Sequence, residues 1–304
     1  MASEIKFDNI CKRIGNRNLL ANLSFGVQNN ELLFIMGKND SGKSSLFKIL
    51  MNMVSIDKGS IFVKGMNFET RKNDILALIG YMPQENNFDE NLNINDNLYY
   101  HGLYRNISYK KIERKILKWS EILNFRKYLN KYPNQISFEV LRKISFFRSI
   151  LNDSPILLLD NPTFGMNYYE KRKIWDIINE IKVNKTILCI SQDFDEVESY
   201  ADRAIIIQNG ECVFNAKLSK IFENISESYR YHFVFKKIVP NSFLKDLKND
   251  KNIYDVISRD VHLEFSTKLK QVFFSKIELA SQYDLVDVRY NQSKIKEIFK
   301  KITD

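Results

Sequence analysis

A glycine-rich turn between residues 37 and 45 carries the clearest chemistry in the sequence. Its spacing is Gly37-x-x-x-x-Gly42-Lys43-Ser44, with an apolar run before it and apolar residues at helix spacing after it. Glycines at those places let successive backbone N–H groups surround phosphate oxygens, and a helix beginning there adds its positive dipole end. The pattern predicts a phosphate-binding loop in which Lys43 contacts the outer phosphates and Ser44 binds Mg²⁺.

We expect the whole turn to contact a nucleotide, through Gly37, Lys38, Asn39, Asp40, Ser41, Gly42, Lys43, Ser44 and Ser45. Asp40 is unusual because it places a negative charge near phosphate groups. Aspartate tolerates a left-handed backbone conformation, which such a loop requires. We therefore expect weakened nucleotide binding rather than its loss.

The elements that would position this loop alternate between strands and helices. Short apolar runs at 31–36, 156–160 and 186–190 predict buried strands. Residues 92–150 are expected to be largely helical, with Ser108 as the N-cap of a helix that carries apolar residues from 112 to 125. A second helix is predicted over 168–181 with Asn167 as its cap, and a hairpin over 204–214. Alternation of this kind predicts an α/β fold with a mostly parallel, helix-covered sheet.

The pattern changes after about residue 215. Alternating apolar and polar residues at 229–236, 261–265 and 286–290 predict three half-buried strands. Helix spacing recurs at 272–277 and 295–302. We therefore expect a domain over 1–225 and a small α+β domain over 226–304.

Composition excludes several other classes of protein. The chain has 304 residues, 44% hydrophobic and 27% charged, which is ordinary for a globular protein. No apolar run approaches the roughly 20 residues that span a bilayer, and the first ten residues lack the apolar core of a signal peptide. Three widely spaced cysteines favour a reduced, cytosolic compartment. The net charge of +9 is spread without a basic block, which favours solvated lysines over nucleic-acid binding.

Further segments occur in an order familiar from one family. Residues 79–85, which contain Gln84, resemble the Q-loop of ATP-binding cassette (ABC) proteins. Residues 156–163, which contain Asp160, resemble their Walker B segment, and residues 201–210 resemble the strand pair that closes the cassette. Residues 79–85 and 91–105 are most similar to exporter ATPases of the drug-resistance and nodulation type, relatives of the A subfamily, and residues 283–290 and 298–303 resemble the small C-terminal domain of those exporters.

This resemblance implies a P-loop cassette with a RecA-like core, an antiparallel β part, a helical subdomain at about 85–152 and a small C-terminal α+β domain. It implies ATP and Mg²⁺ as ligands, with Mg²⁺ held by Ser44, Gln84 and Asp160. The aromatic residue that stacks on adenine in the family corresponds to Ile14 here. The signature segment, which contacts the nucleotide of an opposing cassette, aligns with Ile136, Ser137, Phe138, Glu139 and Val140.

Several positions depart from the family in ways that affect catalysis. Asn161 stands where a glutamate polarises the attacking water, and Gln192 stands where the family has its switch histidine. Asn167 replaces the D-loop aspartate, and Phe138 and Glu139 replace the two signature glycines. Loss of a general base costs roughly 10²–10⁴ in rate, and loss of a charge-stabilising donor about 10²–10³. We therefore expect no intact catalytic group and little ATP turnover.

The resemblance implies an ATP-binding transport subunit. Such a subunit docks on an integral-membrane permease, pairs with a second ABC subunit as a homodimer or heterodimer, and stays at the cytoplasmic face without entering the bilayer. No nucleic-acid partner is expected. One alternative is a nucleotide-gated scaffold or regulator of a membrane complex, which would not support ATP turnover. A soluble cassette protein of translation or DNA repair fits less well, because those carry two cassettes or a long coiled coil.

Overall fold

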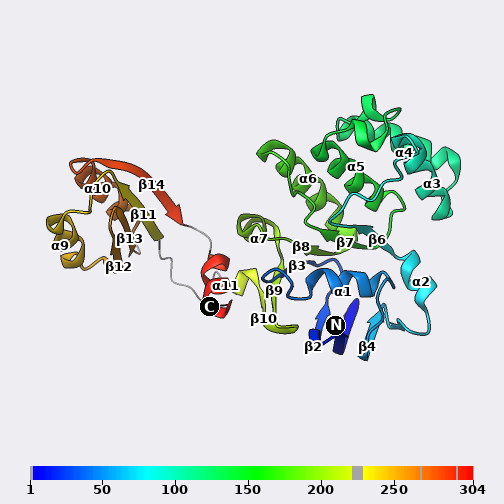
Figure 1. Ribbon diagram of the computed structural model, residues 1–304, viewed down its shortest axis with the longest axis horizontal. Coiled ribbons are helices and arrows are strands. Elements are labelled where there is room, and N and C mark those ends of the chain that lie inside the picture. The colour runs from blue at the N-terminus through cyan, green and yellow to red at the C-terminus, as the bar shows by residue number, and fades with distance from the viewer. Residues whose placement is uncertain (1–2, 221–228, 268, 292–293, 304) are drawn as a thin grey trace. The chain divides into compact units, whose positions relative to one another are not determined.

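The computed structural model describes residues 3–220, 229–267, 269–291 and 294–303 (Figure 1). The chain forms two compact units. The first comprises residues 1–218 with 298–304, and the second comprises residues 219–297. The division follows Leu218, whereas the sequence pattern places it near residue 225.

The first unit is built on a six-stranded sheet in the order β10-β9-β3-β8-β7-β6. Neighbouring strands run parallel except at the edge, where β10 pairs antiparallel with β9. The strands are β3 (Leu32–Met36), β6 (Ile79–Met82), β7 (Ile156–Asp160), β8 (Thr186–Ile190), β9 (Arg203–Gln208) and β10 (Glu211–Lys217). Three of them, β3, β7 and β8, are buried at every residue, as expected for central parallel strands.

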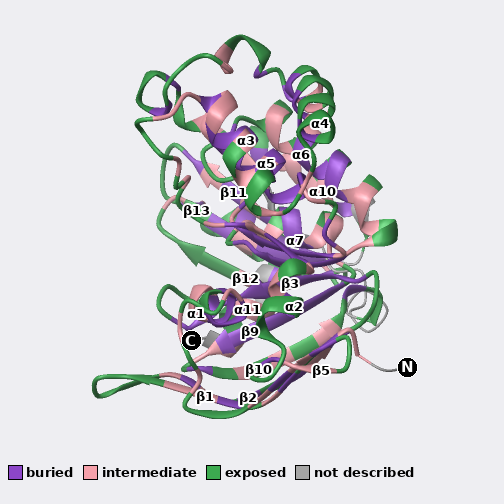
Figure 2. Cartoon of the chain, turned by 90° about the vertical axis from the view of Figure 1, so that its right-hand side faces the viewer, coloured by how far each residue is buried: buried purple, intermediate pink, exposed green. Residues whose placement is uncertain are grey.

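A second, antiparallel sheet in this unit has the order β2-β1-β4-β5. Its strands are β1 (Ile5–Ile14), β2 (Arg17–Val27), β4 (Lys58–Val63) and β5 (Met66–Asn67). One hydrophobic core joins apolar residues of both sheets with those of α1 (Lys43–Leu50). Figure 2 shows the buried residues concentrated in the strands of the central sheet. The α/β class, with an antiparallel part, is confirmed.

The remaining helices of this unit cover the central sheet and form a helical region (Figure 1). They are α2 (Lys72–Ala77), α3 (Ile94–Tyr104), α4 (Tyr109–Ile122), α5 (Phe138–Ile150), α6 (Tyr168–Ile181) and α7 (Phe194–Tyr200), with 3₁₀ turns at 126–128, 133–135 and 182–184. The expected continuation of α4 to Phe125 is wrong. The helix ends at Ile122 because Asn124 takes a left-handed conformation (φ 56°), although Leu123 and Phe125 remain buried.

The second unit has the element order β11-α9-β12-β13-α10-β14, a split β-α-β arrangement. The elements are β11 (Tyr229–Phe235), α9 (Asn241–Asn249), β12 (Ile253–Arg259), β13 (His262–Thr267), α10 (Lys270–Ser281) and β14 (Leu285–Asn291). Helix α11 (Lys294–Thr303) follows, and its residues from Ile298 onward are grouped with the first unit. The antiparallel sheet has the order β12-β13-β11-β14. Among the described residues there is thus one strand and one helix more than the sequence pattern predicts, namely β12 and α9.

The alternation of apolar residues at 286, 288 and 290 predicts that all three share the buried face of a strand, and for Val286 this is wrong, because 64% of its surface is exposed. The pairing of β11 with β14 is irregular between Val234 and Phe235, so Leu285 lies opposite Phe235. A one-residue shift of this kind exchanges the two faces of a strand.

None of the described helices is long and apolar enough to cross a membrane.

Candidate nucleotide-binding site

The phosphate-binding loop lies between β3 and α1, as the sequence predicts. The ammonium of Lys43, the first residue of α1, donates hydrogen bonds to the carbonyl oxygens of Gly37 (2.8 Å) and Lys38 (2.7 Å) and to Ser41 Oγ (3.3 Å). Only 6% of the Lys43 surface is exposed, and this burial lowers its pKa. The loop therefore holds one buried cation at the N-terminus of a helix, where an anion is favoured.

The glycines of the loop are required by its backbone. Gly42 has φ +100°, and a Cβ atom there would lie 2.5 Å from the carbonyl oxygen of Leu19. A Cβ at Gly37 would lie 2.4 Å from the carbonyl oxygen of Ile207. Asp40 takes a left-handed conformation (φ 61°), as expected. The loop thus has the close-packed, glycine-dependent form of a phosphate cradle.

Asp160 ends the central strand β7 and is 1% exposed. Its carboxylate accepts hydrogen bonds from the Ser44 hydroxyl and from Asn161 Nδ2 (3.0 Å). Burial raises the pKa of Asp160, while these hydrogen bonds and the charges of Arg142 and Lys43 oppose the rise. A buried carboxylate beside a hydroxyl fits the oxygen ligands that Mg²⁺ prefers.

Gln84 lies in the loop that follows β6. Because β6 and β7 are parallel, this loop is at the same edge of the sheet as Asp160. Its side chain is exposed, and its backbone carbonyl accepts a hydrogen bond from Arg142 Nη1 (2.9 Å). The same guanidinium donates to the backbone carbonyl of Asp160 (3.0 Å). Arg142 thus joins the backbone of Gln84 to that of Asp160, two residues that are expected to bind Mg²⁺.

Gln192 follows β8 and reaches the phosphate-binding loop. Its Nε2 donates to Asn39 Oδ1 at 2.9 Å. The position that the resemblance assigns to the switch residue therefore lies beside the phosphate-binding loop. An amide there can donate a hydrogen bond but cannot act as a base near neutral pH.

A buried carboxylate fixes the segments around Gln192 and Asn161. Glu196, on α7, accepts hydrogen bonds from Thr163 Oγ1 (2.5 Å) and from Ser191 Oγ (3.0 Å). Thr163 follows the Walker B segment, and Ser191 precedes Gln192. The Glu196 side chain thus connects the loop after β7 and the loop after β8 to α7.

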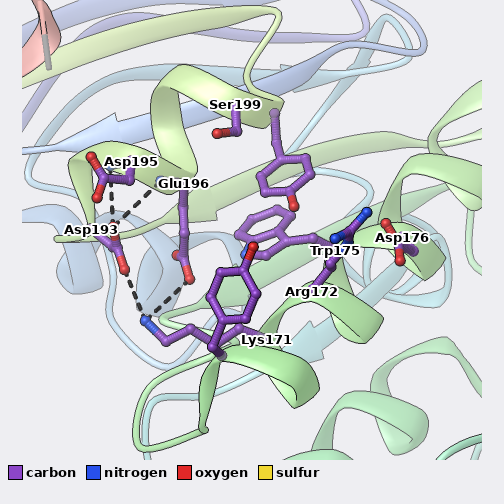
Figure 3. Close-up of a pocket in the computed structure, with 10 residues that line it drawn as sticks. Lys171, Arg172, Trp175, Asp176, Asp193, Asp195, Glu196 and Ser199 are labelled. Atoms are coloured by element: carbon purple, nitrogen blue, oxygen red, sulfur yellow. Dashed lines mark hydrogen bonds and ion pairs between the residues drawn. The ribbon is translucent and has the colours of Figure 1, made fainter. Parts of the chain in front are cut away.

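Lys171 of α6 completes this network at the edge of a pocket of about 620 Å³ between α6 and α7 (Figure 3). Its ammonium lies 2.8 Å from Asp193 and 3.6 Å from Glu196. Burial lowers the pKa of Lys171, but its two acidic partners outweigh burial and the net shift is upward. The network braces the loop that carries Gln192.

Ile14, the residue that the resemblance assigns to the adenine side, ends β1. It is 58% exposed and offers no aromatic ring. Arg17, the first residue of β2, donates through Nη2 to the carbonyl oxygen of Asp40 at 2.8 Å. The β1–β2 hairpin is therefore fixed to the phosphate-binding loop.

The signature segment lies at the N-terminus of α5 and contacts the D-loop of its own chain. The ring of Phe138 packs edge-on against Phe164, with centroids 6.0 Å apart. Glu139 Oε2 accepts a hydrogen bond from Asn167 Nδ2 at 3.2 Å. Gly165 (φ +75°) leaves room for Phe138, because a Cβ there would lie 2.7 Å from the ring. Glu139, which aligns with a glycine of the family, and Asn167, which aligns with the D-loop aspartate, are thus in direct contact.

The structure thus brings together most of the predicted nucleotide site. The loop, Asp160 and Gln192 are linked by hydrogen bonds or by electrostatic proximity. The predicted signature segment contacts the D-loop, through Phe138 with Phe164 and through Glu139 with Asn167. Asn167 also caps α6, as predicted, by accepting from the backbone N–H groups of Tyr169 and Glu170.

The sequence interpretation missed Arg17, Arg142 and Glu196. For Arg142 a signal existed, since an arginine stands among apolar residues in a stretch expected to be helical. For Arg17 and Glu196 no local pattern marks the partner, which lies 23 residues away for Arg17 and 33 residues away, at Thr163, for Glu196.

A strand–glycine loop–helix unit facing a buried carboxylate at the end of a central parallel strand defines a P-loop nucleotide-binding fold.

Comparison with known proteins narrows this class. Residues 20–164 match the family model described as ABC transporter. The Nod factor export ATP-binding protein I of Rhizobium etli is 23% identical over 222 residues, which cover 73% of this chain and 70% of that protein. The Mus musculus glucosylceramide transporter ABCA12 is 27% identical over 266 residues, which cover 86% of this chain and 9% of that protein.

Solved structures agree on the fold. An ATP-binding subunit of an ABC transporter superposes with a TM-score of 0.68 at 20% identity, covering 73% of this chain and 92% of that one. A dimeric ATP-binding cassette bound to ADP and phosphate gives 0.65 at 22% identity, covering 70% and 98%. The chain contains the ATPase domain of the ABC transporter family.

Proposed function

We propose that this chain is the ATP-binding subunit of an ABC transporter complex and that it binds Mg-ATP but hydrolyses it weakly or not at all. The observation that carries the proposal is a contrast within one site. Lys43, Ser44 and Asp160 retain the types and environment needed to bind Mg-ATP, whereas Asn161 and Gln192 occupy the catalytic positions.

Binding follows from groups that the chain supplies itself. The Lys43 ammonium and the N-terminus of α1 attract the phosphates, and the loop amides hydrogen-bond their oxygens. Ser44, Gln84 and Asp160 would hold Mg²⁺, which neutralises phosphate charge when bound. Asp40 and Ile14 weaken the phosphate and adenine contacts respectively.

Weak hydrolysis follows from the proton chemistry. Asn161 Nδ2 donates to the Asp160 carboxylate, so its amide is oriented as a donor and cannot accept a proton from water. Gln192 is oriented toward Asn39 and carries no titratable ring. Glu139 would place a carboxylate where an opposing γ-phosphate needs backbone donors, and Phe138 would fill the space. Each change removes transition-state stabilisation, so their combination should leave turnover near background.

We further propose an integral-membrane permease and a second cassette, identical or different, as partners. Support comes from the relatives, which include proteins named as Nod factor export ATP-binding proteins. In this arrangement the chain stays at the cytoplasmic face of a membrane through the permease. The relative from Mesorhizobium japonicum is matched over only 61% of its length, so the whole complex is part of the proposal.

The proposal is tested by isolating the tagged chain from its own membranes in mild detergent and measuring labelled ATP binding. We expect one nucleotide per chain in Mg²⁺ and a co-purified integral-membrane protein. Binding without a membrane partner would remove the transport role. A co-purified complex whose own ATPase is not raised by this chain would favour the scaffold alternative.

A further inference from the structure

One arginine is buried at the point where two metal-binding segments meet. Arg142, in the first turns of α5, has 0% of its surface exposed. Its Nη1 donates to the backbone carbonyl oxygens of Pro83 (2.7 Å) and Gln84 (2.9 Å), at the start of the Q-loop. Its Nη2 donates to those of Asp160 (3.0 Å) and Asn161 (2.7 Å), at the end of β7.

The charge of Arg142 has no carboxylate partner within ion-pair distance in the described part of the chain. Burial lowers its pKa to about 10, and the charge of Asp160 opposes the shift, so the group stays protonated at neutral pH. An unpaired buried cation is costly unless hydrogen bonds satisfy it. Four carbonyl oxygens, from two segments, accept from its Nη1 and Nη2, whereas its buried Nε has no hydrogen-bond partner.

We propose that Arg142 is a positioning residue for Mg²⁺, which sets the spacing between the backbones of Gln84 and Asp160. The assignment rests on the proposed Mg-ATP binding. Gln84 lies in an exposed loop, and Asp160 ends a buried strand. A rigid bridge between them keeps two of the three expected ligands at a fixed separation before the metal arrives. Pre-organisation of this kind raises metal affinity without any contact to the metal.

The geometry requires a guanidinium. Its planar fork presents donors on two nitrogens, so Nη1 and Nη2 of Arg142 serve different segments at once. A lysine ammonium has one nitrogen on a flexible stem and cannot span both pairs of carbonyls. Arg142→Lys therefore keeps the charge and removes the bridge.

Arg148 provides a matched control on the same helix. Its Nη1 and Nη2 donate to the carbonyl oxygens of Asn87 (2.8 Å) and Asn86 (2.9 Å), and its guanidinium lies over the ring of Phe88 at 4.3 Å. Burial lowers its pKa to about 10 as well. It therefore resembles Arg142 in helix, charge and type of partner, but it holds no expected metal ligand.

The test is a Mg²⁺ titration at a fixed concentration of a fluorescent ATP analogue, with full-length parent, Arg142→Lys, Arg142→Gln and Arg148→Lys. Analogue binding in EDTA is measured in parallel, and thermal unfolding reports folding. Both Arg142 variants should need roughly 10–100 times more Mg²⁺ for half-maximal effect, with EDTA binding changed by less than about twofold. Arg148→Lys should match the parent in both.

Equal Mg²⁺ dependence of the Arg142 and Arg148 variants would overturn this assignment while leaving nucleotide binding intact. Equal loss of binding in EDTA and in Mg²⁺ would also overturn it, because the defect would not concern the metal. If both Arg142 variants unfold while Arg148→Lys folds, Arg142 is a general structural residue and the assignment is wrong. A parent that binds no nucleotide would overturn the proposed function and this assignment together.

Discussion

The phosphate-binding loop and the predicted signature segment lie in the same unit, but they differ in whether they retain the glycines that are typical of the family. The loop retains Gly37, Gly42 and a Lys43 that is 6% exposed. The predicted signature segment has Phe138, which is 45% exposed, and Glu139 at the two positions that align with glycines of the family. One region is constrained by its own chain, and the other faces outward.

The difference has a physical origin. Side chains at Gly37 or Gly42 would collide with backbone of β9 or β2, so a change there disturbs the fold. The side chain at position 138 packs against Phe164 of the D-loop and is exposed to solvent. Substitution of the signature segment therefore costs the chain little stability, although it should cost a composite active site a great deal.

The largest expected effect is on the loop side. Lys43→Ala should weaken Mg-ATP binding by roughly 30- to 150-fold, since a hydrogen bond to a charged group is worth about 2–3 kcal/mol. Lys48→Ala, which removes an exposed lysine from the same helix, is the control and should bind like the parent. Equilibrium titration with labelled ATP measures both. If the two variants bind equally well, the loop is not a nucleotide cradle.

His101, in the helical region between the two segments, should make the stability of the fold depend on pH. Burial, with the charges of Arg148 and Arg105, lowers the pKa of His101 to about 4 from an ordinary value of 6.5. Between these values the unfolded chain binds a proton that the folded chain does not. Stability should therefore be full above about pH 6.5 and fall by roughly 1–3 kcal/mol as pH drops toward 4.

Urea unfolding at pH 7.5, 6 and 5 measures this loss. His101→Gln should flatten the dependence, whereas His262→Gln, which removes an exposed imidazole of the other unit, should not. If stability depends on pH in the same way in the parent and in His101→Gln, His101 binds its proton equally well in the folded and unfolded chains, and its pKa is not lowered by folding.

A smaller effect is expected from the contact between the signature segment and the D-loop. A double-mutant cycle of Phe138→Ala and Phe164→Ala should give a coupling of about 0.5–1.5 kcal/mol in the free energy of unfolding, as for other aromatic pairs. Additive effects would show that the two rings do not pack in solution, and the signature segment would then be free to rearrange.

How far the sequence predicts this structure follows the same contrast. Central strands such as Ile156–Asp160 were predictable because buried parallel strands are continuous apolar runs. The edge strand β12 was missed because most of its residues are exposed and its pattern is weak. The ends of α4 depend on a left-handed Asn124, which apolar spacing does not reveal.

Within the site, chemistry that is local in sequence was predictable and chemistry that spans the fold was not. The spacing of Gly42, Lys43 and Ser44 is enough to predict a cradle. The bridge made by Arg142 joins residues 58 and 18 positions away, so only the folded chain brings its partners together.

We propose that the C-terminal domain folds separately, so its removal should affect the nucleotide site least. Its own core contains Phe233, Phe243, Leu263 and Phe265. Residues 226–304 expressed alone should give a folded circular-dichroism spectrum with a cooperative but shallow melt, as expected for fewer than about 80 residues. A disordered spectrum would show that this region needs the cassette in order to fold.

The central claim is that the chain binds Mg-ATP without turning it over, and phosphate release at saturating ATP tests it most directly. The purified parent should be at background, and Asn161→Glu alone should stay there because Phe138 and Glu139 still block the opposing half-site. A gain of roughly 10²-fold or more should require Asn161→Glu and Gln192→His together with Phe138→Gly/Glu139→Gly. Lys43→Ala in that combined variant should return release to background. Robust phosphate release by the parent chain, abolished by Lys43→Ala, would contradict the account and show that another residue supplies the base.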